Sequence, residues 1–214
     1  MWWTDPGFPQ PGRALWRPLW PLARALAAAG WSLHVEGAAH VPRKGSLVVA
    51  ANHFSHLDPP LVGVAVRRPV RFLALDELFG LNRFFDAVLL GLGAIPVPRG
   101  TKVPIRAMRV ALAHLGQGGA VGVFPEARRV DRWGATEPRQ GAAWLSLRSG
   151  APLLPVAVSG TDLSFGLGSK RLRRSRVRIV LGRPLNPEDF RASGRAAMTR
   201  TWQEWVEERL SAQR

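Results

Sequence analysis

The residues best able to do chemistry stand where an apolar run ends. Leu47–Ala51 is short, apolar and rich in valine, which predicts a buried strand. Asn52 and His53 follow it, and Asp58 comes five residues after the histidine. A neutral imidazole serves as a general base when a carboxylate on its other ring nitrogen fixes the tautomer. His53 and Asp58 are therefore candidates for a base and the group that orients it.

The same stretch also has a plainer interpretation. Asp58 precedes Pro59 and Pro60, which is the pattern of a helix N-cap followed by proline in the first turn. The intervening loop is short enough to fold Asp58 back onto His53. For these two residues alone, an ordinary helix cap beside a structural histidine is the preferred interpretation.

Alternating strand and helix patterns predict the elements that position these residues. They predict an α/β fold with a mostly parallel central sheet flanked by helices, and the chemistry of such sheets gathers beyond the strand C-termini. The expected strands are 31–36, 47–51, 70–75, 94–97, 120–124, 153–158 and 177–181. The expected helices are 59–67, 77–92, 104–115 and 140–148, with a C-terminal amphipathic helix carrying Met198, Trp202, Trp205, Val206 and Leu210.

Composition limits the classes of function. The 214 residues suffice for one domain with a buried core, and the absence of cysteine excludes thiol nucleophiles, disulfides and Cys-ligated metals. No signal-peptide pattern or transmembrane run is present in the sequence. The net charge of +15 implies an anionic partner, which is nucleic acid, an anionic membrane surface or a phosphorylated substrate.

Residues 1–30 are predicted to form an N-terminal amphipathic segment ahead of an α/β domain at 31–214. Pro18 and Pro21 predict that its helix begins near Pro21. Tryptophan and arginine concentrate here, the composition of a membrane-interface anchor. A terminal helix packed on the domain is the alternative interpretation.

Two further loops follow predicted strands at the same edge. One carries Arg99, and the other runs from Phe124 to Arg129. Arginine suits bidentate phosphate binding, and Glu126 could orient a guanidinium or bind an acceptor hydroxyl. A surface Glu–Arg pair of little energetic value is the plainer interpretation. Together with His53 and Asp58, the loops predict a site for a phosphorylated substrate and base-assisted chemistry.

These stretches resemble, in order, four sequence blocks of the glycerolipid acyltransferases, the 1-acylglycerol-3-phosphate acyltransferase family. Asn52-His53-x4-Asp58 resembles the first block, and Gly93 with Arg99 the second. The run from Phe124 to Arg129 resembles the third, whose usual form is Phe-Pro-Glu-Gly-Thr-Arg, and Pro152–Val158 resembles the fourth. Four blocks in family order are far more specific than an isolated His-x4-Asp.

The resemblance implies an O-acyltransferase of phospholipid biosynthesis. It would move a fatty acyl group from acyl-CoA or acyl-carrier protein to a lysolipid hydroxyl, with lysophosphatidic acid as the expected acceptor. His53 would be the base and Asp58 its partner, while Arg99, Glu126, Arg128 and Arg129 would bind the substrate. A thioester is already activated, so the expectation includes no metal and no cofactor beyond the co-substrate.

Two residues depart from the family pattern. Its glycine is Ala127 here, which narrows the freedom of the loop, and its threonine is Arg128, which adds a charge. The departures favour considering another lysolipid acceptor, or a non-catalytic relative that binds anionic lipid. The intact His53 and Asp58 argue against the second alternative.

The most basic stretch runs from Lys170 to Arg178, and the alternation from Arg174 to Leu181 predicts an edge strand with charge facing outward. It could be a solvated face, or it could bind anionic lipid headgroups, an acidic acyl-carrier protein or nucleic acid. Nucleic acid is not expected, because no motif for it is present. The resulting hypothesis is a peripheral enzyme on the cytoplasmic face of a membrane.

Overall fold

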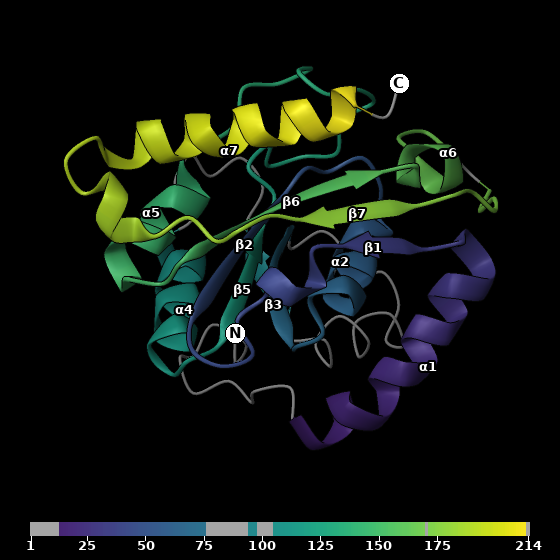
Figure 1. Cartoon of the computed structure of the whole chain (residues 1–214), viewed down its shortest axis with the longest axis horizontal. Helices are drawn as coiled ribbons and strands as arrows, with labels where there is room; N and C mark the ends of the chain where they lie inside the picture. The colour runs from purple at the N-terminus through teal and green to yellow at the C-terminus, as the bar shows by residue number, and fades with distance from the viewer. Residues whose placement is uncertain (1–12, 76–93, 98–104, 170, 213–214) are drawn as a thin grey trace.

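The computed structural model describes residues 13–75, 94–97, 105–169 and 171–212. Seven strands form one sheet in the order β1-β7-β6-β2-β5-β3-β4, in which every neighbouring pair is parallel except β6 and β7 (Figure 1). The strands are β1 His34–Glu36, β2 Leu47–Ala51, β3 Val70–Leu75, β4 Ile95–Val97, β5 Ala120–Val123, β6 Leu153–Ser159 and β7 Arg178–Leu181. The predicted α/β class with a mostly parallel sheet is confirmed.

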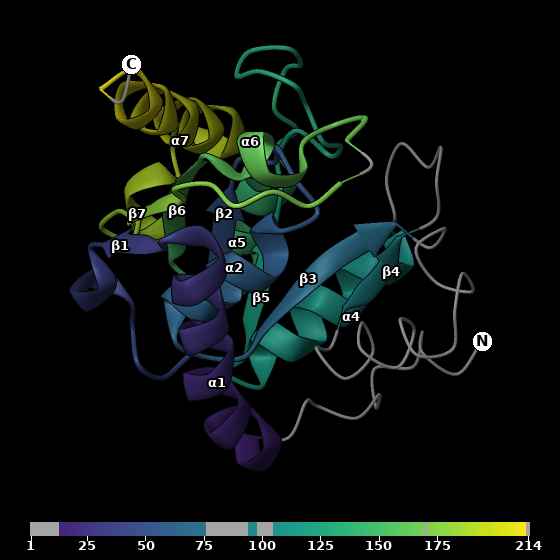
Figure 2. The ribbon, with the colours of Figure 1, turned by 90° about the vertical axis from the view of Figure 1, so that its right-hand side faces the viewer.

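Helices cover both faces of this sheet (Figures 1 and 2). The described helices are α1 Arg13–Trp31, α2 Asp58–Val66, α4 Ile105–Gly116, α5 Gly141–Ser149, α6 Thr161–Phe165 and α7 Gly194–Ser211, with 3₁₀ turns η2 Ala38–His40 and η4 Pro187–Phe190. The C-terminal helix lies where the sequence pattern predicts it, with Met198, Trp202 and Val206 buried. The helix predicted over 77–92 lies outside the described residues.

Strand β2 is the centre of both hydrophobic cores, and all five of its residues are fully buried. Because side chains alternate along a strand, Val48 and Ala50 join a core with α4, α5 and α7. Leu47, Val49 and Ala51 join the opposite core with α1 and α2. Burial on both faces explains the uninterrupted apolar run and fixes the point from which His53 leaves the sheet.

The N-terminal helix differs from the sequence prediction. Helix α1 begins at Arg13, so Pro18 and Pro21 lie within it and do not delay its start. A proline costs a helix about 3 kcal/mol, which is a local penalty that packing can offset. Here Ala27 is buried in the core, and Trp20 Nε1 donates a hydrogen bond to the Val64 carbonyl of α2 at 2.9 Å. The helix also extends through Trp31, so β1 is shorter than the predicted strand 31–36.

Strand β7 is also not the edge strand that its charge alternation predicts. It pairs with β1 on one side and β6 on the other. Arg178 remains compatible with this interior position because its guanidinium is paired in two hydrogen bonds, at 2.7 and 2.9 Å, with the Glu36 carboxylate on β1. No described helix is long and apolar enough to cross a membrane.

Candidate active site

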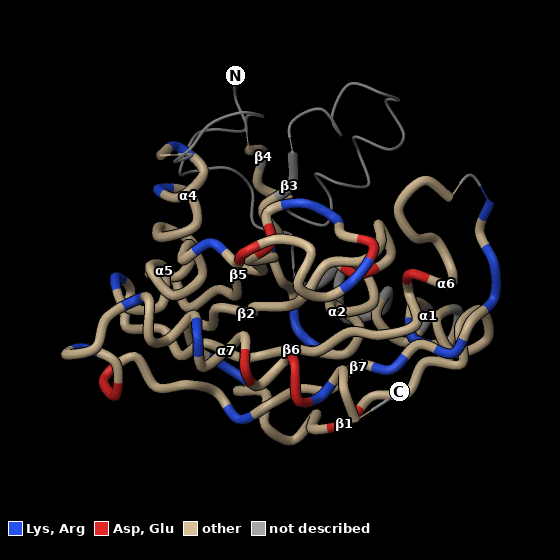
Figure 3. Tube along the Cα trace, turned by 90° about the horizontal axis from the view of Figure 1, so that it is seen from above, with Lys and Arg blue, Asp and Glu red and all other residues tan. Residues whose placement is uncertain are grey.

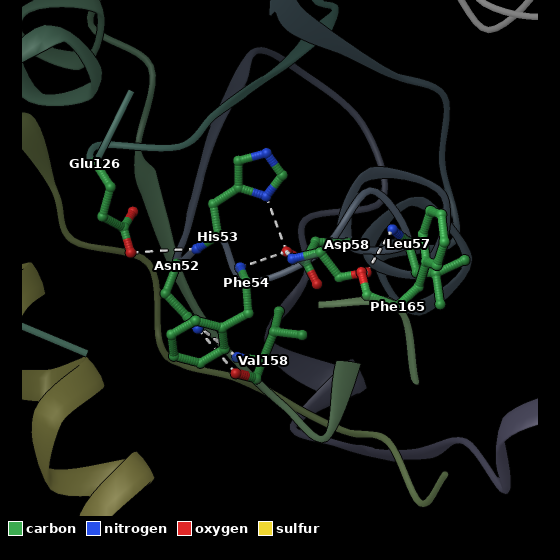
Figure 4. A network of polar contacts seen from close by, with 9 residues as sticks. Asn52, His53, Phe54, Leu57, Asp58, Glu126, Val158 and Phe165 are labelled. Atoms are coloured by element: carbon green, nitrogen blue, oxygen red, sulfur yellow. Dashed lines mark hydrogen bonds and ion pairs between the residues drawn. The ribbon is translucent and has the colours of Figure 1, made fainter. Parts of the chain in front are cut away.

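A side-chain bridge holds the loop that leaves β2. Asn52 Nδ2 donates to the Val158 carbonyl at 2.8 Å, and its Oδ1 accepts from the Val158 amide at 2.7 Å (Figure 4). The amide thus prolongs the β2–β6 pairing by one step after the last paired residues, Ala51 and Val156. Asn52 is fully buried, so both bonds are shielded from water. This bridge fixes the direction in which the next residue, His53, departs.

The predicted His–Asp contact is present. His53 Nδ1 lies 2.8 Å from Asp58 Oδ2. The same oxygen accepts hydrogen bonds from the Phe54 and Ser55 amides, both at 2.7 Å. Asp58 is fully buried, whereas the His53 side chain keeps 15% of its surface exposed. The carboxylate is therefore locked in place beneath an imidazole that water or substrate can still reach.

Asp58 does not cap helix α2, contrary to the sequence prediction. The helix begins at Asp58 itself, and no side chain caps it. Pro59 and Pro60 have no N–H groups to receive a cap, and the next amide, Leu61, donates to the Leu57 carbonyl at 3.1 Å. With no amide to accept from ahead of it, the carboxylate turns back onto the 53–55 loop. The structure therefore favours Asp58 as the partner of His53 over Asp58 as a helix cap.

The loop after β5 surrounds His53 from the other side. The Phe124 ring stacks on the imidazole with centroids 4.0 Å apart and planes at 17°. Glu126 Oε1 accepts from the His53 amide at 3.2 Å, and the Val130 amide donates to the His53 carbonyl at 2.9 Å. The backbone of His53 is thus hydrogen-bonded on both sides, and its ring is held between an apolar face and a carboxylate.

Ala127 makes this second loop turn. Its φ is 56°, in the left-handed region, and its amide donates to the Phe124 carbonyl at 2.9 Å. An L-residue with a Cβ is strained there by roughly 1–2 kcal/mol, which glycine would avoid. The loop therefore keeps the geometry suited to glycine although alanine occupies the position.

Glu126 is unusual for a carboxyl group. It is 5% exposed, and its Oε2 has no hydrogen-bond partner. Burial, with a smaller contribution from the Asp58 charge, raises the pKa of Glu126 to about 7. The sequence predicts that Glu126 orients an arginine or binds an acceptor hydroxyl. One of its oxygens accepts from the His53 amide, and Glu126 makes no ion pair with Arg128 or Arg129 among the described residues. Binding of an acceptor hydroxyl by Glu126 stays a prediction.

The predicted arginines are placed unequally. Arg128 is exposed, and Arg129 is partly buried. The charge of Asp58 acts on Arg129 and opposes the lowering of its pKa by burial, so this guanidinium belongs to the same electrostatic environment as the His–Asp pair. Arg99 lies outside the described residues. The structure thus gathers His53, Asp58 and Glu126 directly, with Arg129 nearby.

Sequence reasoning gave no role to three residues that shape the site. Asn52 bridges to β6, Phe124 supports the imidazole, and Ser55 Oγ donates to the Phe165 carbonyl at 2.8 Å. Asn52 and Phe124 belong to the first and third sequence blocks, which marks them as important but does not indicate what their side chains do. Ser55 gave no signal. No group of three His, Asp or Glu side chains in the described part of the chain is arranged to hold a metal ion.

Comparisons with known proteins point in one direction. A family model described as Acyltransferase matches residues 32–159. The 1-acyl-sn-glycerol-3-phosphate acyltransferase of Borreliella burgdorferi is 29% identical over 143 residues, covering 66% of this chain and 56% of that protein. A probable 1-acyl-sn-glycerol-3-phosphate acyltransferase of Mycoplasma pneumoniae is 28% identical, covering 71% and 60%. The chain thus spans less than two thirds of the length of these relatives.

The fold also has a solved counterpart. The crystal structure of the 1-acyl-sn-glycerophosphate acyltransferase PlsC from Thermotoga maritima matches with a TM-score of 0.71. The match covers 90% of this chain and 78% of that one, at 23% sequence identity. The α/β arrangement of the two molecules is therefore the same.

Proposed function

Because the chain belongs to the Acyltransferase family, we propose that it transfers a fatty acyl group from a thioester to the free hydroxyl of a lysolipid. One observation carries the proposal. At the end of the central strand, an accessible imidazole is held by a fully buried carboxylate at 2.8 Å. The names of the relatives support 1-acylglycerol-3-phosphate as the acceptor.

The hydrogen bonds around Asp58 assign the tautomer of His53. Oδ2 already accepts from two backbone amides, so it acts toward the imidazole as an acceptor and Nδ1 carries the proton. The lone pair is then on Nε2, which faces away from Asp58 (Figure 4). A base in this state is ready to accept the proton of an approaching hydroxyl.

The reaction then needs no covalent enzyme intermediate. Nε2 of His53 takes the proton as the acceptor oxygen attacks the thioester carbonyl carbon, and the negative Asp58 stabilises the imidazolium that forms. The tetrahedral intermediate expels the thiolate, which receives the proton from Nε2. Phe124 and Glu126 keep the ring and backbone of His53 in position through both proton transfers.

The arginines supply the binding of the acceptor. Arg129 is near enough to the pair to meet a phosphate on the same lysolipid, and Arg128 and Arg99 are proposed to assist. The donor would be acyl-CoA or acyl-carrier protein. An anionic membrane surface on the cytoplasmic side would present the acceptor, and residues 1–30 would contribute to that attachment.

A second acceptor is favoured by one observation. Arg128 is exposed beside the left-handed Ala127, where the family pattern has a small hydroxyl residue, so its charge is available to another headgroup. This alternative keeps the reaction and changes the lysolipid. Replacing Arg128 by Thr should therefore change the acceptor preference.

An acceptor screen tests the proposal. One labelled acyl-CoA is offered with a panel of lysolipids that differ in headgroup, and matched reactions replace the CoA ester by acyl-carrier protein. Transfer that is fastest to lysophosphatidic acid is expected. Fastest transfer to another lysolipid would support the second acceptor, and no transfer from either donor to any acceptor would refute the proposed activity.

A further inference from the structure

Residues 160–169 and 171–176 form a projection that we call the α6 lip. Lys170 lies outside the described residues. It leaves the sheet at the C-terminal end of β6, which is parallel to β2, so it lies at the same edge as His53. The Ser55 hydroxyl of the His53 loop donates to the Phe165 carbonyl of the lip at 2.8 Å. Trp31, at the end of α1, donates through Nε1 to Ser164 Oγ. The lip is therefore joined both to the candidate active site and to the N-terminal helix.

Hydrogen bonds inside the α6 lip fix its shape. Ser164 is buried, and its Oγ donates to the Arg173 carbonyl at 2.6 Å. The Arg173 amide returns a hydrogen bond to the Ser164 carbonyl at 3.0 Å, and Ser175 Oγ closes the base of the lip on the Gly160 carbonyl at 2.8 Å. The two arms of the lip are thus connected by hydrogen bonds from α6 to the segment that returns toward β7.

Leucines point outward from this polar interior. Leu163 is 70% exposed, Leu167 55% and Leu172 57%. Single exposed leucines are ordinary on protein surfaces, but these three account for all but one of the large exposed hydrophobic side chains in the described part of the chain. Their concentration at one edge, beside the site, indicates a surface that meets an apolar phase.

Exposed arginines surround these leucines. Arg171, Arg173, Arg174 and Arg176 are exposed, and no acidic side chain of the described residues pairs with them. Arg178, just beyond the lip, differs because Glu36 neutralises it. Asp162 is the acidic residue of the described part of the lip. Figure 3 shows the basic run along the outer margin next to α6.

We propose that the α6 lip docks on an anionic lipid bilayer, with Leu163, Leu167 and Leu172 in the interface and the arginines on the headgroups. Exposed leucines among exposed arginines are the composition of an interfacial membrane contact. An acidic protein would account for the arginines but would leave three separate leucines without an apolar counterpart. The bonded contact between Ser55 and Phe165 then directs the His53 edge toward the bilayer. This last consequence rests on the proposed function, whereas the docking itself does not.

Vesicle co-sedimentation of the full chain tests the docking. The variant Leu163→Ser/Leu167→Ser/Leu172→Ser should partition at least about tenfold more weakly onto phosphatidylcholine vesicles containing phosphatidylglycerol, because it loses its apolar contribution. Ile105→Ser is the matched control, since Ile105 is 59% exposed on α4, far from the lip (Figure 1). The control should partition like the wild type. Equal partitioning of the triple variant and the wild type would overturn the proposal.

The arginines are tested separately through lipid charge. Arg171→Gln/Arg174→Gln should reduce binding to the anionic vesicles by about fivefold for each arginine removed, and should leave binding to pure phosphatidylcholine nearly unchanged. An equal loss on both vesicle types would overturn the headgroup assignment. Unchanged vesicle binding together with lost binding to holo-acyl-carrier protein would assign the surface to an acidic protein instead.

Activity measurements distinguish this proposal from the proposed function. The triple leucine variant should lose acyl transfer to a vesicle-embedded lysolipid and keep wild-type transfer to a short-chain, water-soluble acceptor. Loss on both acceptors would show damage to the site and count against the lip as a docking surface. If the wild type transfers to neither acceptor, the proposed activity fails, while the vesicle-binding result still decides the docking.

Discussion

Two histidine–carboxylate contacts of similar length occur among the described residues, His53–Asp58 at 2.8 Å and His34–Glu36 at 3.1 Å. The first stands at the end of the central strand, with a fully buried carboxylate and a histidine side chain 15% exposed. The second stands on the outermost strand, β1, with side chains 68% and 38% exposed. Solvent weakens and loosens the second contact, so a short distance alone does not make a base.

The partners of each carboxylate differ as well. Asp58 Oδ2 accepts two backbone amides that precede it in the chain, so its position is fixed by the loop. Glu36 is held by the Arg178 guanidinium, whose hydrogen bond lowers the pKa of Glu36, and its charge is already compensated. We therefore assign base chemistry to the pair whose carboxylate is hydrogen-bonded by two backbone amides and the imidazole, and not by a guanidinium.

The largest difference between the two pairs is expected in the rate of acyl transfer by Asp58→Asn. The amide oxygen can still accept from the Phe54 and Ser55 amides, but the imidazolium loses its counter-charge. We expect kcat for acyl transfer to fall by about 10³-fold. Initial rates measure this loss, and circular dichroism checks that the variant is folded. A folded variant within tenfold of the wild-type rate would show that Asp58 does not stabilise the imidazolium of His53.

The buried Glu126 should make stability depend on pH in a way that exposed Glu36 does not. Its pKa rises from 4.5 to about 7 on folding, so the folded state holds more protons between these values. The free energy of unfolding should therefore fall as pH rises from about 4.5 to about 7, by up to about 3 kcal/mol.

Urea unfolding at a series of pH values measures this slope. Glu126→Gln should flatten it, because the amide does not titrate, whereas Glu36→Gln should leave it in place. A slope that is identical in Glu126→Gln and the wild type would show that Glu126 is not the group responsible.

A smaller effect, on the free energy of unfolding, is expected at Ala127, which forms the turn beside Glu126 and His53. Ala127→Gly should raise the free energy of unfolding by up to about 1 kcal/mol, since the strain at φ 56° is relieved and part of the gain is offset by the freedom of glycine in the unfolded chain. Ala135→Gly is the control, because Ala135 lies outside the left-handed region and should lose stability. Equal losses in the two variants would contradict the turn assignment.

The smallest effect is expected at the second pair. His34→Ala should change the free energy of unfolding by less than about 1 kcal/mol, because His34 is mostly exposed and Glu36 keeps Arg178. Acyl-transfer rates should stay at the wild-type value. A rate loss comparable with that of Asp58→Asn would abolish the distinction between the pairs.

Much of this arrangement follows from the sequence, for identifiable reasons. The five buried residues of β2 are all apolar, and His53 follows them after one residue, so the strand and the departure point could be predicted together. The order of the motif-bearing loops along the chain placed them at one edge, because parallel strands end at the same side. These features depend on local pattern and on the topology common to α/β sheets.

The remaining features depend on tertiary contacts that no local pattern encodes. Arg178 on β7 resembles an edge-strand residue until Glu36 of β1, distant in sequence, is brought beside it. The sequence predicts that Glu126 contacts its neighbouring arginines, but in the folded chain it accepts a hydrogen bond from the His53 amide. The direction of the Asp58 carboxylate depends on which nearby amides need an acceptor. That depends on the residue at which α2 begins, which the sequence pattern does not fix.

The most direct measurement is the rate of acyl transfer by His53→Ala beside that of the wild type, with a labelled acyl-CoA and lysophosphatidic acid. We expect a loss of about 10³-fold in kcat, with vesicle binding and the thermal unfolding midpoint retained. Turnover near the wild-type rate in the folded variant would contradict the central claim that His53 is the base.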